Sequence, residues 1–239
     1  MSLLQLTSIA KSFDGAEVLH NLSLDVGAGS VTAIVGDNGA GKSTLLKVMS
    51  GIHAPDHGSV MLAGDDVTGL DAMARRAAGI EMVYQDLALS KQQDVVTNLF
   101  MGREMCAGSG FLQRKAMHMA AVGHLQRLGI HIADLKQPIG HLSGGQQQAV
   151  AIARAAMFEP KVLLLDEPTA ALAAREVDRV LGLIRTQKTA GRAVILVSHR
   201  LNDVFAVADR IVVMKQGTIL SDDPASSVTL PEIVERIVS

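Results

Sequence analysis

The sequence predicts an α/β protein with a mostly parallel core sheet, an N-terminal antiparallel β subdomain and an inserted α-helical subdomain. Apolar, β-branched runs alternate with segments of helical spacing along most of the 239 residues, which is typical of a parallel sheet. Two strand-like runs near the N-terminus flank a turn signal, which favours an antiparallel pair. Between residues 86 and 140, where Gln, Met and His are common, such runs disappear. We therefore expect one domain over 1–239, with the helical subdomain at approximately 86–140.

Local patterns place the individual elements in order. Residues 4–7 and 18–26 are strand-like, and Asp14-Gly15 between them favours a turn. Further strands are expected at 31–35, 59–62, 80–84, 161–166, 193–198 and 211–214. Helices are expected from residue 45, from Asp71 to Gly79, from Ser143 to Phe158, around residues 177–184 with a stop at Gly191, and after Thr229, which can form a capping box with Glu232.

One glycine-rich stretch carries the strongest chemical signal. It reads Gly36-Asp37-Asn38-Gly39-Ala40-Gly41-Lys42-Ser43-Thr44 and fits G-x-x-x-x-G-K-[S/T], the phosphate-binding loop of nucleotide hydrolases. Glycines let the backbone close around a polyphosphate, so that successive N–H groups point at its oxygens. Lys42 supplies positive charge to the β- and γ-phosphates, and Ser43 offers a hydroxyl to Mg²⁺. A glycine-rich turn without nucleotide is the alternative, but the preceding strand and following helix disfavour it.

Two adjacent acids end the expected strand at 161–166. A carboxylate at this position can hold Mg²⁺, and a second one can polarise an attacking water molecule. We assign Asp166 to the metal and Glu167 to the water. A solvated turn is the alternative, which the phosphate loop in the same chain makes less favourable.

Two polar residues follow other core strands. His199 comes after 193–198 and can donate a hydrogen bond to the γ-phosphate or to the attacking water. Gln85 comes after 80–84 and can reach the metal or the water. We group both with Glu167 and Lys42 as catalytic residues, although either one alone would be weak evidence.

A second anion-binding helix start lies at Leu142-Ser143-Gly144-Gly145-Gln146, where a hydroxyl and two glycines open a helix. Two phosphate-facing helix ends for one nucleotide suggest that two chains share each site.

The composition indicates which classes of partner and which compartment to expect. The net charge of −2, the pI of about 6.4 and the scarcity of aromatic residues indicate no nucleic-acid partner. The single cysteine, Cys106, suits a reducing compartment. No apolar run is long enough to span a bilayer and the N-terminus lacks a signal peptide, so we expect a soluble, cytosolic protein that reaches a membrane through partners. Four histidines share no metal-ligand spacing and are expected to be structural: His118, His124, His131 and His141.

Together these motifs resemble the ATP-binding cassette (ABC) family over essentially the whole chain. The resemblance implies that 36–44 is the Walker A loop, 142–146 the signature and 162–167 the Walker B strand, with Gln85 as the Q-loop glutamine and His199 as the switch histidine. Phe13 falls where the family places an aromatic ring that stacks on adenine. ATP and Mg²⁺ are the implied cofactors. Head-to-tail dimers are implied as well, with each ATP between one chain's Walker A loop and its partner's signature.

Four stretches, 36–43, 83–89, 98–104 and 166–172, resemble those of ribose/fructose-type sugar importers. The implied role is the ATPase subunit of a bacterial monosaccharide importer, peripheral on the cytoplasmic face of the inner membrane. The implied partners are transmembrane permease subunits, a second cassette subunit in a homodimer and, indirectly, a periplasmic or lipoprotein sugar-binding protein. Many members of this branch fuse two cassettes, whereas this chain carries one.

One position departs from the family pattern. Ala173 stands in the D-loop where many members carry an aspartate that helps to join the two sites, so the strength of coupling between sites is open.

An importer of another solute, such as a nucleoside or an amino acid, remains an alternative. A soluble ABC ATPase that acts on DNA or ribosomes is a second one, although no coiled-coil insertion, tandem cassette or basic arm is visible.

Overall fold

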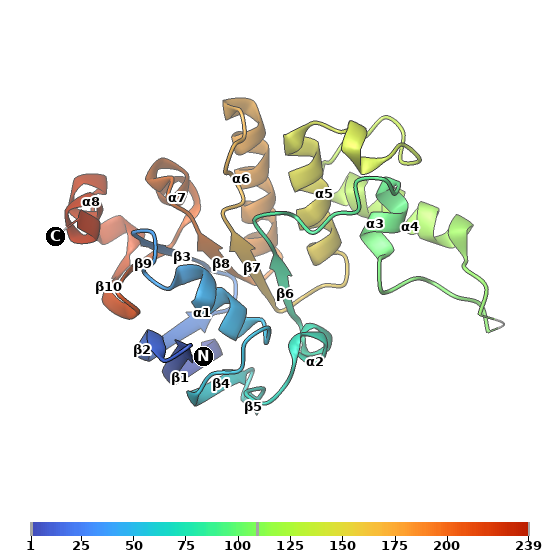
Figure 1. The fold of residues 1–239 in the computed structure, drawn as a ribbon. Helices are drawn as coiled ribbons and strands as arrows, with labels where there is room; N and C mark the ends of the chain where they lie inside the picture. The colour runs from blue at the N-terminus through green and yellow to red at the C-terminus, as the bar shows by residue number, and fades with distance from the viewer. Residues whose placement is uncertain (1, 109, 239) are drawn as a thin grey trace.

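The computed structural model describes residues 2–108 and 110–238, which fold around two β-sheets (Figure 1). The smaller sheet is antiparallel, with the strand order β2-β1-β4-β5. The larger has the order β10-β9-β3-β8-β7-β6, and all its pairs are parallel except that of β9 with β10. The α/β architecture with a mostly parallel core sheet and an N-terminal antiparallel sheet is therefore confirmed.

The described elements run in the order β1-β2-β3-α1-β4-β5-α2-β6-α3-α4-α5-β7-α6-β8-α7-β9-β10-α8, with two short 3-10 turns. The strands are β1 (Ser2–Phe13), β2 (Ala16–Gly27), β3 (Val31–Gly36), β4 (His57–Leu62), β5 (Asp65–Asp66), β6 (Ile80–Val83), β7 (Val162–Asp166), β8 (Ala193–Val197), β9 (Arg210–Lys215) and β10 (Thr218–Pro224). The helices are α1 (Lys42–Met49), α2 (Ala72–Ala78), α3 (Val95–Phe100), α4 (Arg114–Arg127), α5 (Gly144–Ala156), α6 (Ala174–Thr189), α7 (Leu201–Val207) and α8 (Leu230–Val238), and the 3-10 turns are η1 (Ile139–His141) and η2 (Ala225–Ser227).

Strand β1 is much longer than the run 4–7 that its sequence predicts. Its pairing with β2 shifts register between Leu6 and Ile9, where Ser8 has a φ of 53°. Such an irregularity inserts an extra residue and breaks the alternation of inward and outward side chains. The later part of the strand therefore loses the period-2 pattern from which a strand is predicted.

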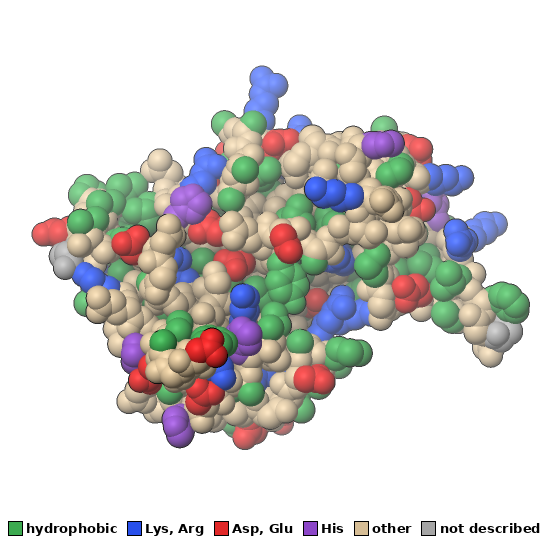
Figure 2. All heavy atoms as spheres, in the orientation of Figure 1, with side chains coloured by type: hydrophobic (Ala, Val, Ile, Leu, Met, Phe, Trp, Pro, Cys, Tyr) green, Lys and Arg blue, Asp and Glu red, His purple; other side chains and the backbone are tan. Residues whose placement is uncertain are grey.

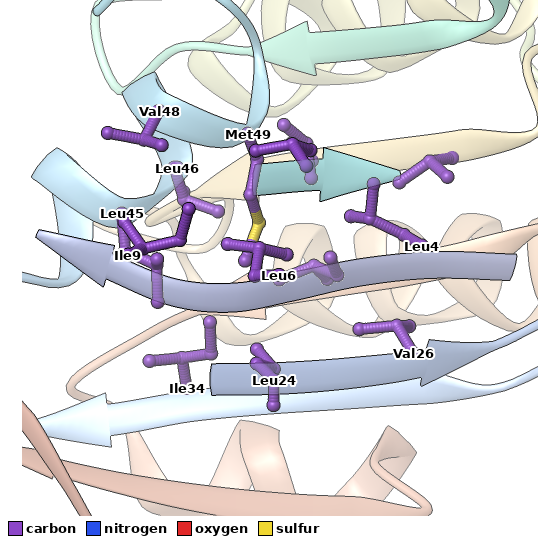
Figure 3. Close-up of a cluster of buried hydrophobic side chains, with 14 of the residues drawn as sticks. Leu4, Leu6, Ile9, Leu24, Val26, Ile34, Leu45, Leu46, Val48 and Met49 are labelled. Carbon is purple, nitrogen blue, oxygen red and sulfur yellow. The ribbon is translucent and has the colours of Figure 1, made fainter. Parts of the chain in front are cut away.

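The buried core between the two sheets holds the helix that follows the phosphate loop. Leu45, Leu46 and Met49 of α1 are fully buried against Leu4, Leu6 and Ile9 of β1 (Figure 3). On its other side α1 packs against the core sheet through the same cluster, which also includes Ile34 of β3. Burial on both sides fixes α1, and with it the start of the helix at Lys42.

The opposite face of the core sheet is covered by α5 and α6, which pack on β7 and β8 (Figure 1). Helices α7 and α8 pack on β3 and β9 in a separate cluster. The stretch 86–140 contains α3 and α4, whose apolar side chains form a core of their own with the inner face of α5. In the described residues no helix is both long and apolar enough to cross a membrane.

The loop between α3 and α4 projects from the rest of the protein, and Figure 2 shows hydrophobic side chains at its end. Phe111 is 77% exposed, and Met105 and Leu112 are exposed as well. This projecting loop is a short hairpin. The Ala107 N–H donates to the Phe111 carbonyl, and the Gln113 N–H donates to the Met105 carbonyl.

Candidate active site

The residues singled out by the motifs meet at one edge of the core sheet. Gly36 ends β3, Gln85 follows β6, Asp166 ends β7, and His199 follows β8. Because these strands are parallel and adjacent, their carboxyl ends lie side by side, where ligands bind in such sheets. A cavity of about 690 Å³ opens there, lined by 36–39 and 41–44 together with Gln85, Glu167 and His199.

Two glycines of the phosphate loop occupy positions that strongly disfavour a side chain. Gly36 has a φ of +151°, and a Cβ there would lie 2.2 Å from the Met214 carbonyl oxygen. Gly41 has a φ of +96°, and its Cβ would lie 2.9 Å from a methyl group of Leu19. The loop is thus pressed against β9 and β2, and within it the N–H groups of Asn38 and Ala40 donate to Asp37.

Lys42 is buried beneath the loop. Its Nζ donates to the carbonyl oxygens of Gly36 at 2.8 Å and Asp37 at 2.7 Å. Burial lowers the pKa of Lys42, while the negative charges of Glu167, Asp37 and Asp166 act in the opposite direction. A polyphosphate would offer this cation charged oxygens in place of two neutral carbonyls, which makes a stronger hydrogen bond.

Ser43 and Asp166 form an oxygen-rich pair behind the loop. The Ser43 hydroxyl donates to Asp166 Oδ1 at 3.3 Å, and Asp166 is only 6% exposed. Burial raises the pKa of Asp166, against the opposing effect of the Ser43 hydrogen bond. A buried carboxylate that is short of positive charge, beside a hydroxyl, fits Mg²⁺, which takes one or two protein oxygens and fills its other positions with water and phosphate. The described residues hold no group of three or more His, Cys, Asp or Glu that would suit a metal site made by protein alone.

Glu167 and His199 contact each other at the mouth of the cavity. Oε2 of Glu167 lies 2.8 Å from Nδ1 of His199, and it also accepts from the His199 backbone N–H at 3.4 Å. The Glu167 side chain is 12% exposed whereas that of His199 is 63% exposed. Glu167 has a φ of +51°, an uncommon conformation for a residue with a side chain, and its N–H donates to the Val197 carbonyl of β8. This backbone turns the carboxylate towards the histidine of the neighbouring strand.

Arg200, which the sequence analysis does not single out, ties the His199 loop to the segment after Glu167. Its guanidinium donates to the Thr169 carbonyl at 3.0 Å and forms an ion pair with Asp203 at 3.1 Å. The pair lies three residues apart at the start of α7, a spacing that could have drawn attention to it.

Seven apolar residues that the motifs do not include also line the cavity, of which Val35 and Val197 belong to the core strands β3 and β8. Val18 comes from β2 and Leu201 from α7, and three more come from α8. The sequence predicts the helix after Thr229, which is α8, but nothing in its pattern indicates where the apolar side of the helix packs. The three residues from α8 are Val234, Ile237 and Val238.

Phe13 and Ala40 are not among the described residues that line the cavity. Phe13 ends β1, where its partly exposed ring meets His53 edge-to-face at a centroid distance of 5.0 Å. Ala40 is buried behind the phosphate loop against the core.

The helix start at 143–146 also lies outside this cavity. Ser143 caps α5 as expected, because its Oγ accepts from the Gln146 N–H at 3.2 Å. The Gln146 side chain accepts in return from the Ser143 N–H at 3.1 Å, which completes a capping box. One chain therefore brings together the phosphate loop, Glu167, Gln85 and His199 around the cavity, with Asp166 bonded to Ser43, and leaves Ser143, Gly144, Gly145 and Gln146 elsewhere.

The two-sheet core and this arrangement at the sheet edge define an ATP-binding cassette. The chain belongs to the ABC transporter family, whose model matches residues 19–170. It is 40% identical over 237 residues to the xylose/arabinose import ATP-binding protein XylG of Sulfolobus acidocaldarius, which covers 99% of this chain and 94% of that protein. It is 38% identical over 236 residues to the ribose import ATP-binding protein RbsA 2 of Streptomyces avermitilis, covering 99% of this chain and 46% of the relative. The chain thus spans about half the length of the ribose import relatives it matches.

Solved structures show the same fold. MJ1267, described as an ATP-binding cassette of an ABC transporter, superimposes with a TM-score of 0.86 at 29% identity, over 100% of both chains. MJ0796, described as a dimeric ATP-binding cassette bound to ADP and Pi, superimposes with a TM-score of 0.80 at 25% identity, over 93% of this chain and 98% of that one.

Proposed function

We propose that this chain is the ATP-hydrolysing subunit of a monosaccharide importer. The observation that carries the proposal is the cavity in which Lys42, Glu167 and His199 meet beside the Ser43–Asp166 pair. The import function is supported by the relatives, which are ribose and xylose/arabinose import ATP-binding proteins. We propose a single domain over 1–239, in which the stretch at about 86–140 contacts the permease.

Each site residue then has a task. The N–H groups of residues 36–44 hold the phosphates, and Lys42 exchanges the carbonyls of Gly36 and Asp37 for phosphate oxygens. Ser43 and Asp166, with Gln85, would hold Mg²⁺, which supplies positive charge to the phosphates. Phe13, partly exposed at the end of β1, is proposed to stack on the adenine ring.

Glu167 is proposed to accept a proton from the attacking water. His199, 2.8 Å from Glu167, holds this carboxylate in place and presents its exposed ring edge to the γ-phosphate. Because Glu167 is nearly buried, few solvent molecules compete for its oxygens. A positioned base of this kind contributes about 10²–10⁴ to the rate.

A second subunit is proposed to complete each site. Ser143, Gly144, Gly145 and Gln146 lie outside the cavity of their own chain, so they would serve the ATP of a partner cassette, and a dimeric relative supports this arrangement. Permease subunits are the proposed membrane partners, with a sugar-binding protein acting on them from the other side. The complex is proposed to sit on the cytoplasmic face of the bacterial inner membrane.

The test is ATP hydrolysis by the cassette reconstituted with its permease in vesicles, across a panel of sugars with candidate binding proteins. We expect one sugar and its binding protein to raise hydrolysis, and the Glu167→Gln complex to show no such rise. Stimulation by a nucleoside or an amino acid, and by none of the sugars, would reassign the solute. Purification of the cassette with RNA or DNA and without a membrane protein would reject the transport function.

A further inference from the structure

The N-terminal end of α5 is already occupied by an anionic group of the same chain. Oε1 of Glu176, in the first turn of α6, accepts from the Ser143 hydroxyl at 2.9 Å and from the Gly145 N–H at 3.2 Å. Its Oε2 accepts from the Ala173 N–H at 3.4 Å, at the start of α6. One carboxylate therefore joins the signature segment to the D-loop position.

The absence of a side chain at residue 145 permits this contact. A Cβ at Gly145 would lie 2.6 Å from Cδ and Cγ of Glu176, which is closer than real Cβ atoms come. The glycine thus opens room for one oxyanion close to the helix end. Glu176 fills that room.

The Ser143 hydroxyl and the Gly145 N–H are the donors that a partner's terminal phosphate would need. The hydrogen bond from Ser143 is the main reason that the pKa of Glu176 is lowered, so the carboxylate is ionised at neutral pH. A phosphate that approaches these donors therefore meets a negative charge that already holds them. Two negative charges that compete for the same donors repel each other, so each weakens the binding of the other.

We propose that Glu176 is an internal substitute for the partner's γ-phosphate, which blocks the signature end in the separate subunit and must swing out when the ATP-bound dimer closes. This inference rests on the shared site proposed above. Its consequence is that dimer closure also frees the N–H of Ala173, where this chain lacks the usual D-loop aspartate. Displacement of Glu176 by a partner's phosphate would then change the contacts of the segment that follows Glu167.

Glu176 also has a local role that the test must separate from the gating role. As the third residue of α6, it accepts from the N–H of the residue that precedes the helix, and glutamine serves at this position as well as glutamate. Glu176→Gln therefore removes the charge and keeps the cap. Asp178→Asn removes an exposed charge two residues further along the same helix, and is the matched control.

The experiment measures ATP-dependent dimer formation by analytical ultracentrifugation, in the Glu167→Gln background that slows hydrolysis. Adding Glu176→Gln should lower the dimer dissociation constant by about tenfold or more, with unchanged ATP affinity of the monomer, because the competing charge is gone. Adding Asp178→Asn should leave it unchanged. An equal or weaker dimer with Glu176→Gln overturns the gating role. If the Glu167→Gln protein itself stays monomeric with ATP, the failure lies instead in the shared site on which the inference rests.

A second measurement follows the Gly145 amide by NMR during titration with inorganic tripolyphosphate, in a Lys42→Ala background that weakens binding at the phosphate loop. The Glu176→Gln protein should show a saturable shift of this amide, and the protein with Glu176 should respond only at much higher concentration. Equal responses of the two proteins would show that Glu176 does not compete for the helix end. This readout needs no dimer and no hydrolysis.

Discussion

Substitution of Glu167 should affect hydrolysis of ATP without affecting its binding. Glu167→Gln keeps the size of the side chain and its contact with His199, but removes the basic oxygen that we propose accepts the proton of water. We expect hydrolysis to fall by about 10²-fold or more with ATP affinity nearly unchanged. Single-turnover hydrolysis and calorimetric ATP binding measure the two effects. Near-normal turnover would remove Glu167 from its proposed role.

Asp166 should show a conflict between stability and function. Burial raises its pKa above the unfolded value, so the ionised form costs stability in the metal-free subunit once the pH is above the folded pKa. Asp166→Asn removes that cost and keeps a partner for the Ser43 hydroxyl. We therefore expect a higher Tm at neutral pH, with Mg²⁺-dependent hydrolysis lower by about 10²-fold or more.

The sign of this effect can be checked against pH. Below the unfolded pKa of Asp166 both states are protonated, so the Tm advantage of Asp166→Asn should disappear in acid. Scanning calorimetry without Mg²⁺ or nucleotide, from neutral pH down to the acid range, measures it. A lower Tm for the variant at neutral pH would show that hydrogen bonding outweighs burial at this carboxylate.

Residues that form a contiguous motif or follow a core strand could be predicted from the sequence, and Glu176 could not. The phosphate loop, the acid pair and His199 each sit at a strand end, so their spacing alone indicates that they converge at one edge. Glu176 has no such mark, because an acidic residue in the first turn of a helix is ordinary capping chemistry. Its contact with Ser143 depends on how α5 and α6 pack side by side, which spacing does not reveal.

Among the elements, α6 begins without a capping side chain. Ala173 precedes the helix and has no side-chain oxygen to accept from the first turn, where serine or aspartate would have one. Ala173→Ser should stabilise the subunit by about 0.5–1 kcal/mol. For a domain of this size, 1 kcal/mol raises the Tm by roughly 2–4 °C.

Thermal unfolding measures this gain, and Ala174→Ser provides the matched control. Residue 174 is the first helical residue, where a serine hydroxyl cannot accept from the first turn in the same way. We expect no gain there. Equal effects of the two variants would show that the added hydroxyl acts through something other than capping.

Elements with one clear periodicity agree best with the expectation from sequence. The predicted helix from Asp71 to Gly79 matches α2 and both of its caps, and the buried strand at 193–198 matches β8 to within one residue. Strand β10 was not expected, because its residues alternate only between partly buried and exposed in the structure and so include no strong apolar run. Sequence patterns report burial, and an edge strand with little burial leaves a weak pattern.

At the scale of the whole molecule, one chain does not assemble the complete proposed site. The signature end of α5 is outside the cavity and is engaged by Glu176. Hydrolysis by the isolated subunit should therefore rise faster than linearly with protein concentration in the dilute range. Constant specific activity down to concentrations at which ultracentrifugation with ATP shows only monomer would contradict the shared site.

Ser143→Arg is the variant that tests the same point without dilution. The arginine would obstruct the helix end that a partner's phosphate needs, so hydrolysis should be lost while ATP binding to the monomer remains nearly intact. Mixing this variant with Lys42→Ala should create one site with both defects and one with neither. Partial return of activity is expected, to the extent that the two sites work independently with Ala173 in the D-loop.

The strand order also determines when the protein can become functional during its synthesis. Strand β3, which leads into the phosphate loop, lies between β8 and β9, and β9 ends at Lys215. The ribosome must add roughly 180 residues after Gly36 before both neighbours exist. At about 5–20 residues per second, that takes on the order of 10 to 40 seconds. Until then β3 lacks at least one of its two neighbours in the sheet, so the apolar segment that leads into the phosphate loop stays incompletely buried and open to wrong contacts for most of the synthesis.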